Sequence, residues 1–485
     1  MASYVCGIDI GISGTKVLIL RKDGFVVARS LSNLPAPISN ERKSVQNPFL
    51  WWQCVKDALS QALTLLVQAG GSPKDVSAIC IDATSGTIVP VDENLNPLDD
   101  AIMYNDSRAT EETRELNFLA IEDIKHLGYR FDTRFALPKI LYMKKNNQNV
   151  WDRTRYILHQ ADFIVTRLMG ENALAITDTS NALKTGYDIL NFRWPKYLDD
   201  LDIKEKMPTV VKTGSIIGQI SKEVCEEFNL SKDIKIIAGM TDSVAACTAS
   251  GVKKDGDMNT ILGSTLTWKV LSKNIVKDEY GRIYSHLHPS GSYLPGGMGN
   301  SGGFGIRRMM DASPKELTEY AFKLNTTLPS SFFAYPLPEI GEKYPFIDPW
   351  FKPFVTKSEG KGACLYKALI ESVACIERWG YETLESLQAD IHGDVWTTGG
   401  GAMVDSWMKI RANVLNRVVL RTRFPESVYG AALTAAMGVW FNGDFAKTAD
   451  SYIIEMARFE PNNECVKRYD EYYHAFRQKV LSNKS

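Results

Sequence analysis

Apolar and polar positions follow one another along the chain in an order that predicts alternating strands and helices. Apolar runs over Tyr4–Arg29 are interrupted by glycine turns and predict consecutive strands. Asn47–Gly70 has apolar residues at helical spacing and ends on glycines, which predicts a helix. Val76–Val91 then predicts a strand, a turn and a second strand. Such an order is typical of α/β domains.

The central stretch Ile236–Gly251 predicts a strand that runs into a helix, with Asp242 near the start of that helix. Free backbone N–H groups and the helix dipole favour a carboxylate at that position. The residues that follow are mostly small, so another backbone or a ligand can come close to the helix. Taken alone, this pattern fits an aspartate that caps a buried helix as well as one that acts on a ligand.

A second cycle of the same pattern begins after the central stretch. Met258–Ser272 repeats the opening design, because an apolar strand, the turn Gly263-Ser264-Thr265 and another apolar strand follow one another. Two such turns, each near the start of one half of the chain, predict a duplicated α/β unit with a cleft between the halves. Later segments predict a helix over Ala363–Leu387, a strand running into three glycines over Asp394–Asp405, and a small-residue helix over Ser427–Phe441.

Length, charge and cysteine content limit the kinds of protein that this chain can be, but they do not indicate a reaction. A chain of 485 residues is expected to form two or three domains. A net charge of −1 gives no general attraction to nucleic acid or to an anionic membrane. The eight cysteines are scattered without a CxxC pair, which favours a reducing compartment over a disulfide or zinc framework. The absence of a signal-peptide pattern and of a long apolar segment leads us to expect a soluble, cytoplasmic protein.

The first glycine turn carries candidate chemistry. Asp9 lies at the edge of the predicted first strand, and Gly11, Ser13, Gly14 and Thr15 follow it. Glycines let a ligand approach the backbone, and successive N–H groups in such a turn can bind an anion. An aspartate beside a phosphate requires a divalent cation between the two. A plain hairpin with an unrelated aspartate fits these residues equally well.

Two further polar segments are candidate ligand contacts. Ser85 lies at the bend between the two strands predicted in Val76–Val91, and Asn105, Asp106 and Arg108 crowd a short segment further on. These groups donate and accept hydrogen bonds, so they suit the hydroxyls of a polyol, although a solvated turn fits them too.

One glycine pattern, by contrast, is not assigned a nucleotide role. Residues 297–302 match the spacing of the dinucleotide fingerprint, but the strand before them is short and contains Pro295. We expect this segment to let the next helix pack closely. The chain has no GxxxxGK[ST] motif of the P-loop class.

Four of these segments, in this order, resemble motifs of the FGGY carbohydrate kinases, which belong to the superfamily of sugar kinases, actin and heat-shock ATPases. GIDIGISGTK is similar to the first phosphate motif, NTILGSTL to the second and TTGGGAMVDSW to the adenosine motif, while AGMTDSVAA carries the family's catalytic aspartate. The resemblance runs from about Val5 to about Trp440. Within the family, DATSGTIVPVD, MYNDSRA, LKTGYD and DEYGRIYSH most resemble the D-ribulose kinase or plant xylulose kinase-like branch.

The resemblance implies two actin-like (ribonuclease H-like) α/β domains, residues 1–245 and 246–485, with an active-site cleft between them. It implies transfer of the γ-phosphoryl group of ATP to a hydroxyl of a pentulose, with D-ribulose, giving D-ribulose 5-phosphate, as the first candidate. Xylulose and other polyols remain alternatives, as does a non-catalytic sugar or nucleotide sensor. The implied cofactors are ATP and Mg²⁺, and the implied state is a monomer or homodimer with no nucleic-acid or membrane partner.

The resemblance also assigns roles to individual residues. Asp242 would be the catalytic base, and Asp9 would hold Mg²⁺ through water. The residues that would contact the sugar are Asp9, Ser85, Asn105, Asp106, Arg108 and Asp242. The residues that would bind ATP are Gly11, Ile12, Ser13, Gly14, Thr15, Gly263, Ser264, Thr265, Gly400, Gly401, Val404 and Trp407.

Two positions depart from the family pattern. Ile12 stands where the family usually has Thr or Ser, so a side-chain contact to phosphate or metal is lost there, and Ser13 or Thr15 is the expected substitute. Val404 stands where Asn is common near adenine. Both departures bear on nucleotide affinity and turnover rather than on the fold.

Overall fold

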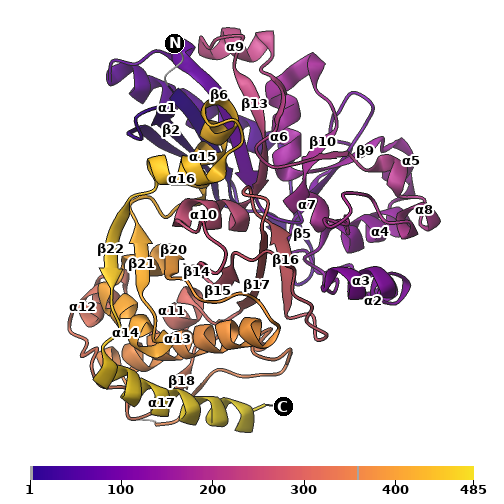
Figure 1. Cartoon of the computed structure of the whole chain (residues 1–485). Coiled ribbons are helices and arrows are strands. Elements are labelled where there is room, and N and C mark those ends of the chain that lie inside the picture. The colour runs from indigo at the N-terminus through magenta and orange to yellow at the C-terminus, as the bar shows by residue number, and fades with distance from the viewer. Residues whose placement is uncertain (1–3, 358–359, 485) are drawn as a thin grey trace. The chain divides into compact units, whose positions relative to one another are not determined.

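The computed structural model describes residues 4–357 and 360–484, which form two compact units (Figure 1). Unit 1 contains residues 4–248, 286–291 and 427–452, and unit 2 contains residues 249–285, 292–426 and 453–484. The domain boundary expected after residue 245 lies close to the end of the first segment of unit 1. Unit 1 also takes up the small-residue helix predicted over Ser427–Phe441.

Unit 1 is built on a six-stranded sheet. Its strands, in sheet order, are β12 (Ile216–Gln219), β13 (Lys235–Thr241), β6 (Val76–Ala83), β1 (Tyr4–Ile10), β2 (Gly14–Arg21) and β3 (Val26–Asn33). β1 pairs antiparallel with β2 and parallel with β6, and β6 pairs parallel with β13. The carboxyl ends of β1, β6 and β13 therefore lie at one edge of the sheet.

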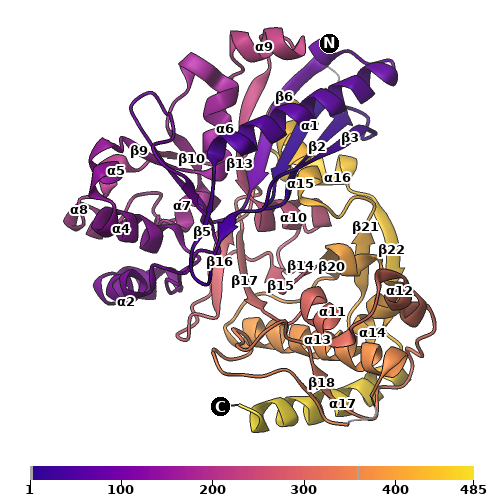
Figure 2. The same ribbon diagram turned by 180° about the vertical axis from the view of Figure 1, so that it is seen from behind.

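Helices cover both faces of this sheet. α1 (Pro48–Gln68) and α6 (Gln160–Met169) lie on one face, and α15 (Ser427–Trp440) lies on the other, as the two opposite views show (Figures 1 and 2). α15 packs closely because glycine backbones meet there: a Cβ at Gly7 would lie 2.4 Å from the Val428 carbonyl oxygen, and one at Gly430 2.0 Å from that of Ala245.

The remaining elements of unit 1 include a smaller sheet and several short helices. The smaller sheet is ordered β4 (Ile38–Ser39), β5 (Ser44–Gln46), β8 (Ala101–Ile102), β7 (Ile88–Val91) and β9 (Tyr156–His159), and a separate pair joins β10 (Ile176–Asp178) to β11 (Thr209–Val211). The helices are α2 (Thr110–Leu119), α3 (Ile121–Leu127), α4 (Ala136–Asn146), α5 (Gln148–Arg153), α7 (Thr179–Leu183), α8 (Tyr197–Asp200), α9 (Lys222–Phe228), α10 (Asp242–Ser250) and α16 (Phe445–Tyr452).

Unit 2 repeats the strand order of unit 1. Its seven-stranded sheet is ordered β16 (Ile283–Leu287), β17 (Tyr293–Gly299), β15 (Leu266–Val270), β14 (Met258–Leu262), β20 (Val395–Thr398), β21 (Val419–Thr422) and β22 (Glu455–Phe459). β14 pairs antiparallel with β15 and parallel with β20, just as β1 pairs with β2 and β6. This correspondence is what a duplicated α/β unit predicts.

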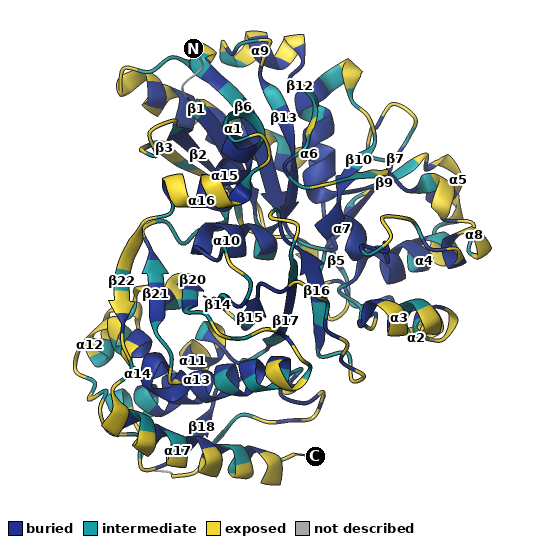
Figure 3. Ribbon diagram, viewed as in Figure 1, coloured by how far each residue is buried: buried dark blue, intermediate teal, exposed yellow. Residues whose placement is uncertain are grey.

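Helices α13 (Gly362–Ser386) and α14 (Asp405–Leu415) pack together beside this sheet, and α17 (Asn463–Ser482) packs on them from outside. The other elements are α11 (Gly303–Met310), α12 (Pro314–Phe322), and the pair β18 (Ala334–Tyr335) and β19 (Phe354–Val355). In both units the central strands are buried and the outer helices carry the exposed positions (Figure 3). Across the described ranges, no helix is both long and apolar enough to cross a membrane.

Candidate active site

Three aspartates come together at the strand ends of unit 1. Asp9 near the end of β1 lies directly opposite Asp82 of β6 in the parallel ladder. Asp242 is the first residue of α10 and follows β13, the next strand of the same sheet. The predicted strand-to-helix junction at Asp242 is therefore confirmed. A cluster of carboxylates results, because parallel strands end at the same edge.

Asp9 is held by groups from two other elements. It is 7% exposed, and its Oδ2 accepts a hydrogen bond of 2.8 Å from the hydroxyl of Ser427, the first residue of α15. The ammonium of Lys16, its partner across the β1–β2 ladder, lies 3.8 Å from Oδ2. A buried carboxylate is costly without such partners, so this aspartate is held in a fixed orientation.

Asp82 is fully buried between its two neighbours. Burial, and after it the negative charges of Asp9 and Asp242, raise the pKa of Asp82 well above the usual value for an aspartate. The dominant cause is desolvation, which disfavours the charged form. The positive charge of Lys16 acts in the opposite direction and lowers this pKa, and a cation bound at the cluster would likewise favour the charged form of Asp82.

Asp242 is half-buried, and its Oδ1 accepts a hydrogen bond of 2.6 Å from the backbone N–H of Ser243. The residue before it is also fixed: the Thr241 N–H donates to the hydroxyl of Ser180 at 2.9 Å. Ser180 in turn donates to Asp178, which caps the start of α7, at 2.6 Å. A chain of hydrogen bonds from α7 therefore positions the junction that carries Asp242.

The MYNDSRA segment has both exposed and buried side chains. Tyr104 lies near enough to Asp242 that the aspartate's charge adds to burial in raising the pKa of Tyr104. Asn105 is exposed, whereas Asp106 is buried. Sequence reasoning did not single out Tyr104, although it belongs to the same short polar segment.

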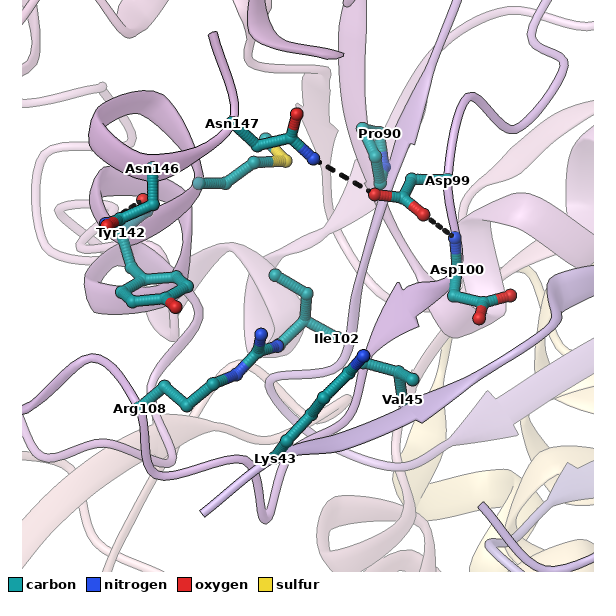
Figure 4. A pocket seen from close by; sticks show the side chains of 11 residues that line it. Lys43, Val45, Pro90, Asp99, Asp100, Ile102, Arg108, Tyr142, Asn146 and Asn147 are labelled. Carbon is teal, nitrogen blue, oxygen red and sulfur yellow. Dashed lines mark hydrogen bonds between the residues drawn. The ribbon is translucent and has the colours of Figure 1, made fainter. Parts of the chain in front are cut away.

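Asp106 and Arg108 bind one another. The Arg108 Nε lies 3.0 Å from each carboxylate oxygen of Asp106, and Nη2 lies 2.8 Å from one of them. Asp106 also accepts the backbone N–H of Ser44 at 2.8 Å. Arg108 stacks 5.1 Å from the ring centre of Tyr142 and lines a pocket of about 180 Å³ together with Lys43 (Figure 4).

Ser85 lies in a turn that is tied to α6. Gln160, the first residue of α6, accepts hydrogen bonds from the backbone N–H and the hydroxyl of Thr84, at 3.2 and 2.5 Å. The Ser85 hydroxyl and the Gln160 side-chain NH₂ have no hydrogen-bond partner among the described residues, although both atoms are buried. Buried polar groups are normally satisfied, so these two suit a ligand that brings hydroxyl groups.

The first glycine turn is closed by its own backbone. The Gly11 N–H donates to the Gly14 carbonyl at 3.0 Å, so this amide is engaged within the turn. Ile12 packs against the hydrophobic core of unit 1, and Ser13 is exposed. Thr15 is buried, and its hydroxyl has no described partner. An anion bound at this turn would therefore have to use amides that follow Gly11.

The second glycine turn is built in the same way. The Gly263 N–H donates to the Thr265 carbonyl at 3.1 Å, and Ser264 is exposed at the tip. The glycines at the start of α11 pack directly on this turn, since the Gly303 N–H donates to the Gly263 carbonyl at 3.0 Å. A Cβ at Gly302 would lie 2.7 Å from the Ser264 carbonyl oxygen. The close packing predicted for this segment is therefore observed at Gly302 and Gly303, whereas Gly297 and Gly299 belong to strand β17.

The third glycine segment leaves open space at its tip. A Cβ added at Gly400 would meet no described atom within 4 Å, whereas one at Gly401 would lie 2.8 Å from the ring of Trp407. Trp407 is 4% exposed and so supports the loop from beneath. Val404 precedes α14 and packs partly against the core of unit 2. Arg421, which sequence reasoning missed, donates to the Ala402 carbonyl at 2.8 Å and braces this loop.

The residues fit a divalent cation only in part. The described chain holds no group of three or more His, Cys, Asp or Glu residues arranged as a metal site. Mg²⁺ is commonly bound by one or two carboxylates, with water and substrate phosphates completing its coordination. Asp9, with Asp82 and Asp242 beside it, offers enough carboxylates for such a partly hydrated Mg²⁺. These residues do not form a metal site made by protein ligands alone.

Comparison with known proteins identifies the chain's relatives. Residues 4–249 match the N-terminal domain of the FGGY family of carbohydrate kinases, and residues 307–439 match its C-terminal domain. A xylulose kinase of Staphylococcus epidermidis is 25% identical over 97% of this chain and 95% of its own length. A ribulokinase of Staphylococcus aureus is 23% identical over 98% of this chain and 95% of its own length.

Solved structures show the same fold. A ligand-bound xylulose kinase from Lactobacillus acidophilus superimposes with a TM-score of 0.87 at 18% identity, covering 99% of this chain and 98% of its own. A glycerol kinase from Plasmodium falciparum with ADP gives a TM-score of 0.84 at 18% identity over the same shares. The predicted fold class, two actin-like (ribonuclease H-like) α/β domains, is confirmed.

Proposed function

Because the chain belongs to the FGGY family of carbohydrate kinases, we propose that it transfers the γ-phosphoryl group of ATP to a hydroxyl of a pentulose. The observation that carries this proposal is the position of Asp242, which starts α10 beside two buried carboxylates. The family match, the three glycine loops and this aspartate support one reaction together.

Phosphoryl transfer has a loose transition state, so the protein acts mainly by positioning groups and compensating charge. Asp242 accepts the proton of the attacking sugar hydroxyl, and the hydrogen bonds to Ser243 N–H and through Thr241 keep its carboxylate in place. ATP and a divalent cation, when bound, supply the phosphoryl group and offset its charge. Asp9 would hold that cation, and the hydrogen bond from Ser427 fixes the orientation of the Asp9 carboxylate.

The glycine loops bind the nucleotide in this proposal. The amides after Gly11 in unit 1, and those at Ser264 and Thr265 in unit 2, donate to phosphate oxygens. Gly400 gives adenine room to lie against the backbone, since no described side chain fills that space. Gly401, Val404 and Trp407 shape the floor of this loop. The isoleucine at position 12 contributes its backbone, because its side chain packs inward.

The sugar is held in unit 1. Ser85 and Gln160 offer a buried hydroxyl and a buried NH₂ group to sugar hydroxyls, and Tyr104 borders Asp242. Asn105 is available at the surface. Asp106 and Arg108 are engaged with each other, and we propose that this pair shapes the sugar-binding segment.

Two pentuloses are candidates. D-xylulose comes first, because several relatives, one of them 25% identical to this chain, are named xylulose kinases. D-ribulose is the second candidate, because DATSGTIVPVD and MYNDSRA resemble the D-ribulose kinase branch and a ribulokinase is among the relatives.

The test is release of ADP from Mg²⁺-ATP with D-xylulose, D-ribulose, L-xylulose, L-ribulose, glycerol and ribitol in turn. Turnover with a pentulose and little with glycerol or ribitol is expected. Turnover with glycerol alone would show that the substrate is a polyol and not a pentulose. If no sugar were turned over while ADP still bound, a non-catalytic sugar or nucleotide sensor would be the better assignment.

A further inference from the structure

An ion pair lies wholly inside unit 2, beneath two of its glycine loops. Arg411 of α14 and Glu377 of α13 are both 0% exposed. The Arg411 Nε donates to Oε2 of Glu377 at 2.7 Å, and Nη2 donates to Oε1 at 2.7 Å. Two parallel bonds of this kind fix the relative position of guanidinium and carboxylate more strictly than a single contact does.

The ion pair is also bonded to two strands of the sheet. Nη1 of Arg411 donates to the hydroxyl of Thr397 in β20 at 2.8 Å, and the hydroxyl of Thr260 in β14 donates to Oε1 of Glu377. Thr260 also shares a hydrogen bond of 2.8 Å with the hydroxyl of Tyr381 on α13. Thr260 and Thr397 are directly opposite each other in the parallel ladder. The ion pair is therefore hydrogen-bonded to both strands, at two residues that lie directly opposite each other.

Each strand leads straight into a glycine loop. Thr260 lies three positions before Gly263, and Thr397 lies three positions before Gly400. The loops touch where the strands end, since a Cβ at Gly399 would lie 2.6 Å from the Leu262 carbonyl oxygen and one at Gly401 2.7 Å from the Leu262 Cβ. A shift of one strand along the other would therefore move one loop relative to the other.

Stability alone does not account for this ion pair. Taking two charges out of water is costly, and apolar side chains of similar volume often stabilise a core as well or better. The neighbouring positions of both helices are filled by apolar residues such as Ile376 and Ile410, both fully buried. What an apolar pair would lack is the directed bonding to Thr260 and Thr397.

We propose that Arg411 and Glu377 are positioning residues for the nucleotide. They fix the offset between β14 and β20, so that the loop at Gly263–Thr265 and the loop at Gly399–Gly401 take the two ends of one nucleotide. This inference rests on the proposed function for the assignment of those loops. Neither residue contacts the nucleotide, and both act through Thr260 and Thr397.

The first test is Arg411→Lys, which keeps the charge and loses the forked geometry. The dissociation constant for ADP, measured by calorimetry on the full chain, is expected to rise about tenfold, the change produced by about 1.4 kcal/mol. The KM for the pentulose is expected to stay within about twofold. Hydrogen exchange of the amides in both loops is expected to speed up in the protein without nucleotide.

Arg378→Lys is the matched control. Arg378 is the next residue on α13 and also makes charged bonds, to Glu382 at 2.9 Å and to Asp470 of α17 at 2.6 Å, away from the two strands. It is expected to leave ADP affinity and loop exchange unchanged. Equal effects of the two substitutions on thermal stability alone, with ADP affinity and loop exchange as in the wild type, would overturn the inference.

The double variant Glu377→Met with Arg411→Met tests whether the loss of ADP affinity comes from the missing ion pair or from a loss of stability. Its melting temperature is expected to equal or exceed that of the wild type, with ADP affinity lowered about tenfold or more. Normal ADP affinity in this folded variant would also overturn the inference. If wild-type protein failed to bind ADP, the proposed function would fall, and the loop exchange rates would still decide whether the ion pair holds the loops.

Discussion

The hydroxyl of Ser427 donates a hydrogen bond of 2.8 Å to Oδ2 of Asp9, although the two residues are 418 positions apart in the chain. Ser427 begins α15, which lies on the sheet of unit 1 after the chain has passed through unit 2. The proposed cation ligand at the start of the chain is therefore oriented by a residue near its end.

Ser427→Ala is expected to lower kcat/KM by about tenfold or more, because a hydrogen bond to a charged group contributes about 1.5–3 kcal/mol. Mn²⁺ binding in the presence of ADP, followed by electron paramagnetic resonance, is expected to weaken as well. Ser427→Thr keeps a hydroxyl and is expected to restore most of both.

Ser30→Ala is the control for that substitution. It also removes one serine hydrogen bond in unit 1, the one that the Ser30 hydroxyl donates to the Ala58 carbonyl at 2.6 Å. If both variants affected cation binding equally, the special role of Ser427 would be refuted.

Ser180→Ala is expected to lower kcat and leave ADP affinity unchanged. The Ser180 hydroxyl links Asp178 to the Thr241 N–H, immediately before Asp242. Losing this link frees the junction that carries the base, and an error of about 1 Å in such placement can reduce turnover about a hundredfold. Steady-state kinetics with the best pentulose check this, and an unchanged kcat in a folded variant would contradict it.

Substitutions in the third glycine loop are expected to separate nucleotide binding from folding. Gly400→Val fills open space, so thermal stability is expected to stay near that of the wild type while the KM for ATP rises about tenfold. Gly399→Ala is the contrast, because Gly399 has a φ of +84° and its Cβ would meet the Leu262 carbonyl. The free energy of unfolding of the Gly399→Ala variant is expected to be about 1–2 kcal/mol lower than that of the wild type. Thermal unfolding and ATP titrations distinguish the two, and a destabilised Gly400→Val protein would contradict the assignment of open space.

Lys139 makes stability depend on pH. Burial lowers the pKa of Lys139 to about 7, and its ammonium has a hydrogen bond of 2.9 Å to the Phe135 carbonyl. Between pH 7 and about 10, the unfolded chain therefore binds a proton that the folded chain does not. The free energy of unfolding is expected to rise with pH over this window and to be lowest, as far as this group contributes, below pH 7.

Lys139→Met is expected to remove that rise and to raise unfolding free energy at pH 7 by about 2 kcal/mol, since one pKa unit corresponds to about 1.4 kcal/mol and part of the gain is offset by the lost hydrogen bond. Urea denaturation at pH 7, 8 and 9 measures the effect. Lys145→Met, at a more exposed position of α4, is the control. Parallel pH profiles for wild type and Lys139→Met would show that the buried lysine is already compensated.

The order of elements could be predicted from the sequence because its signals are local. Glycine turns between apolar runs marked β1–β2 and β14–β15, and the start of α10 at Asp242 followed from a β-branched run changing to small residues. The same kind of signal placed α1 and α13 within a residue or two of their observed ends.

The side-chain pairings could not be predicted, because they join elements that are distant in sequence. A serine at the start of a helix indicates a cap, and nothing in Ser427 itself points to Asp9. The buried Glu377 resembles a solvated helix position until Arg411 is placed opposite it. For Asp106 and Arg108, the residue types suggested hydroxyl contacts, and only the fold shows that they bind each other.

The most direct test of the account compares wild type with Asp242→Asn, an isosteric change that removes the base. ADP release from Mg²⁺-ATP with the preferred pentulose is expected to fall about a thousandfold, within the usual range for general base catalysis. Calorimetry is expected to give an ADP dissociation constant within about twofold of the wild type. A variant that retained more than about a tenth of the wild-type rate, with ADP bound normally, would show that Asp242 is not the base.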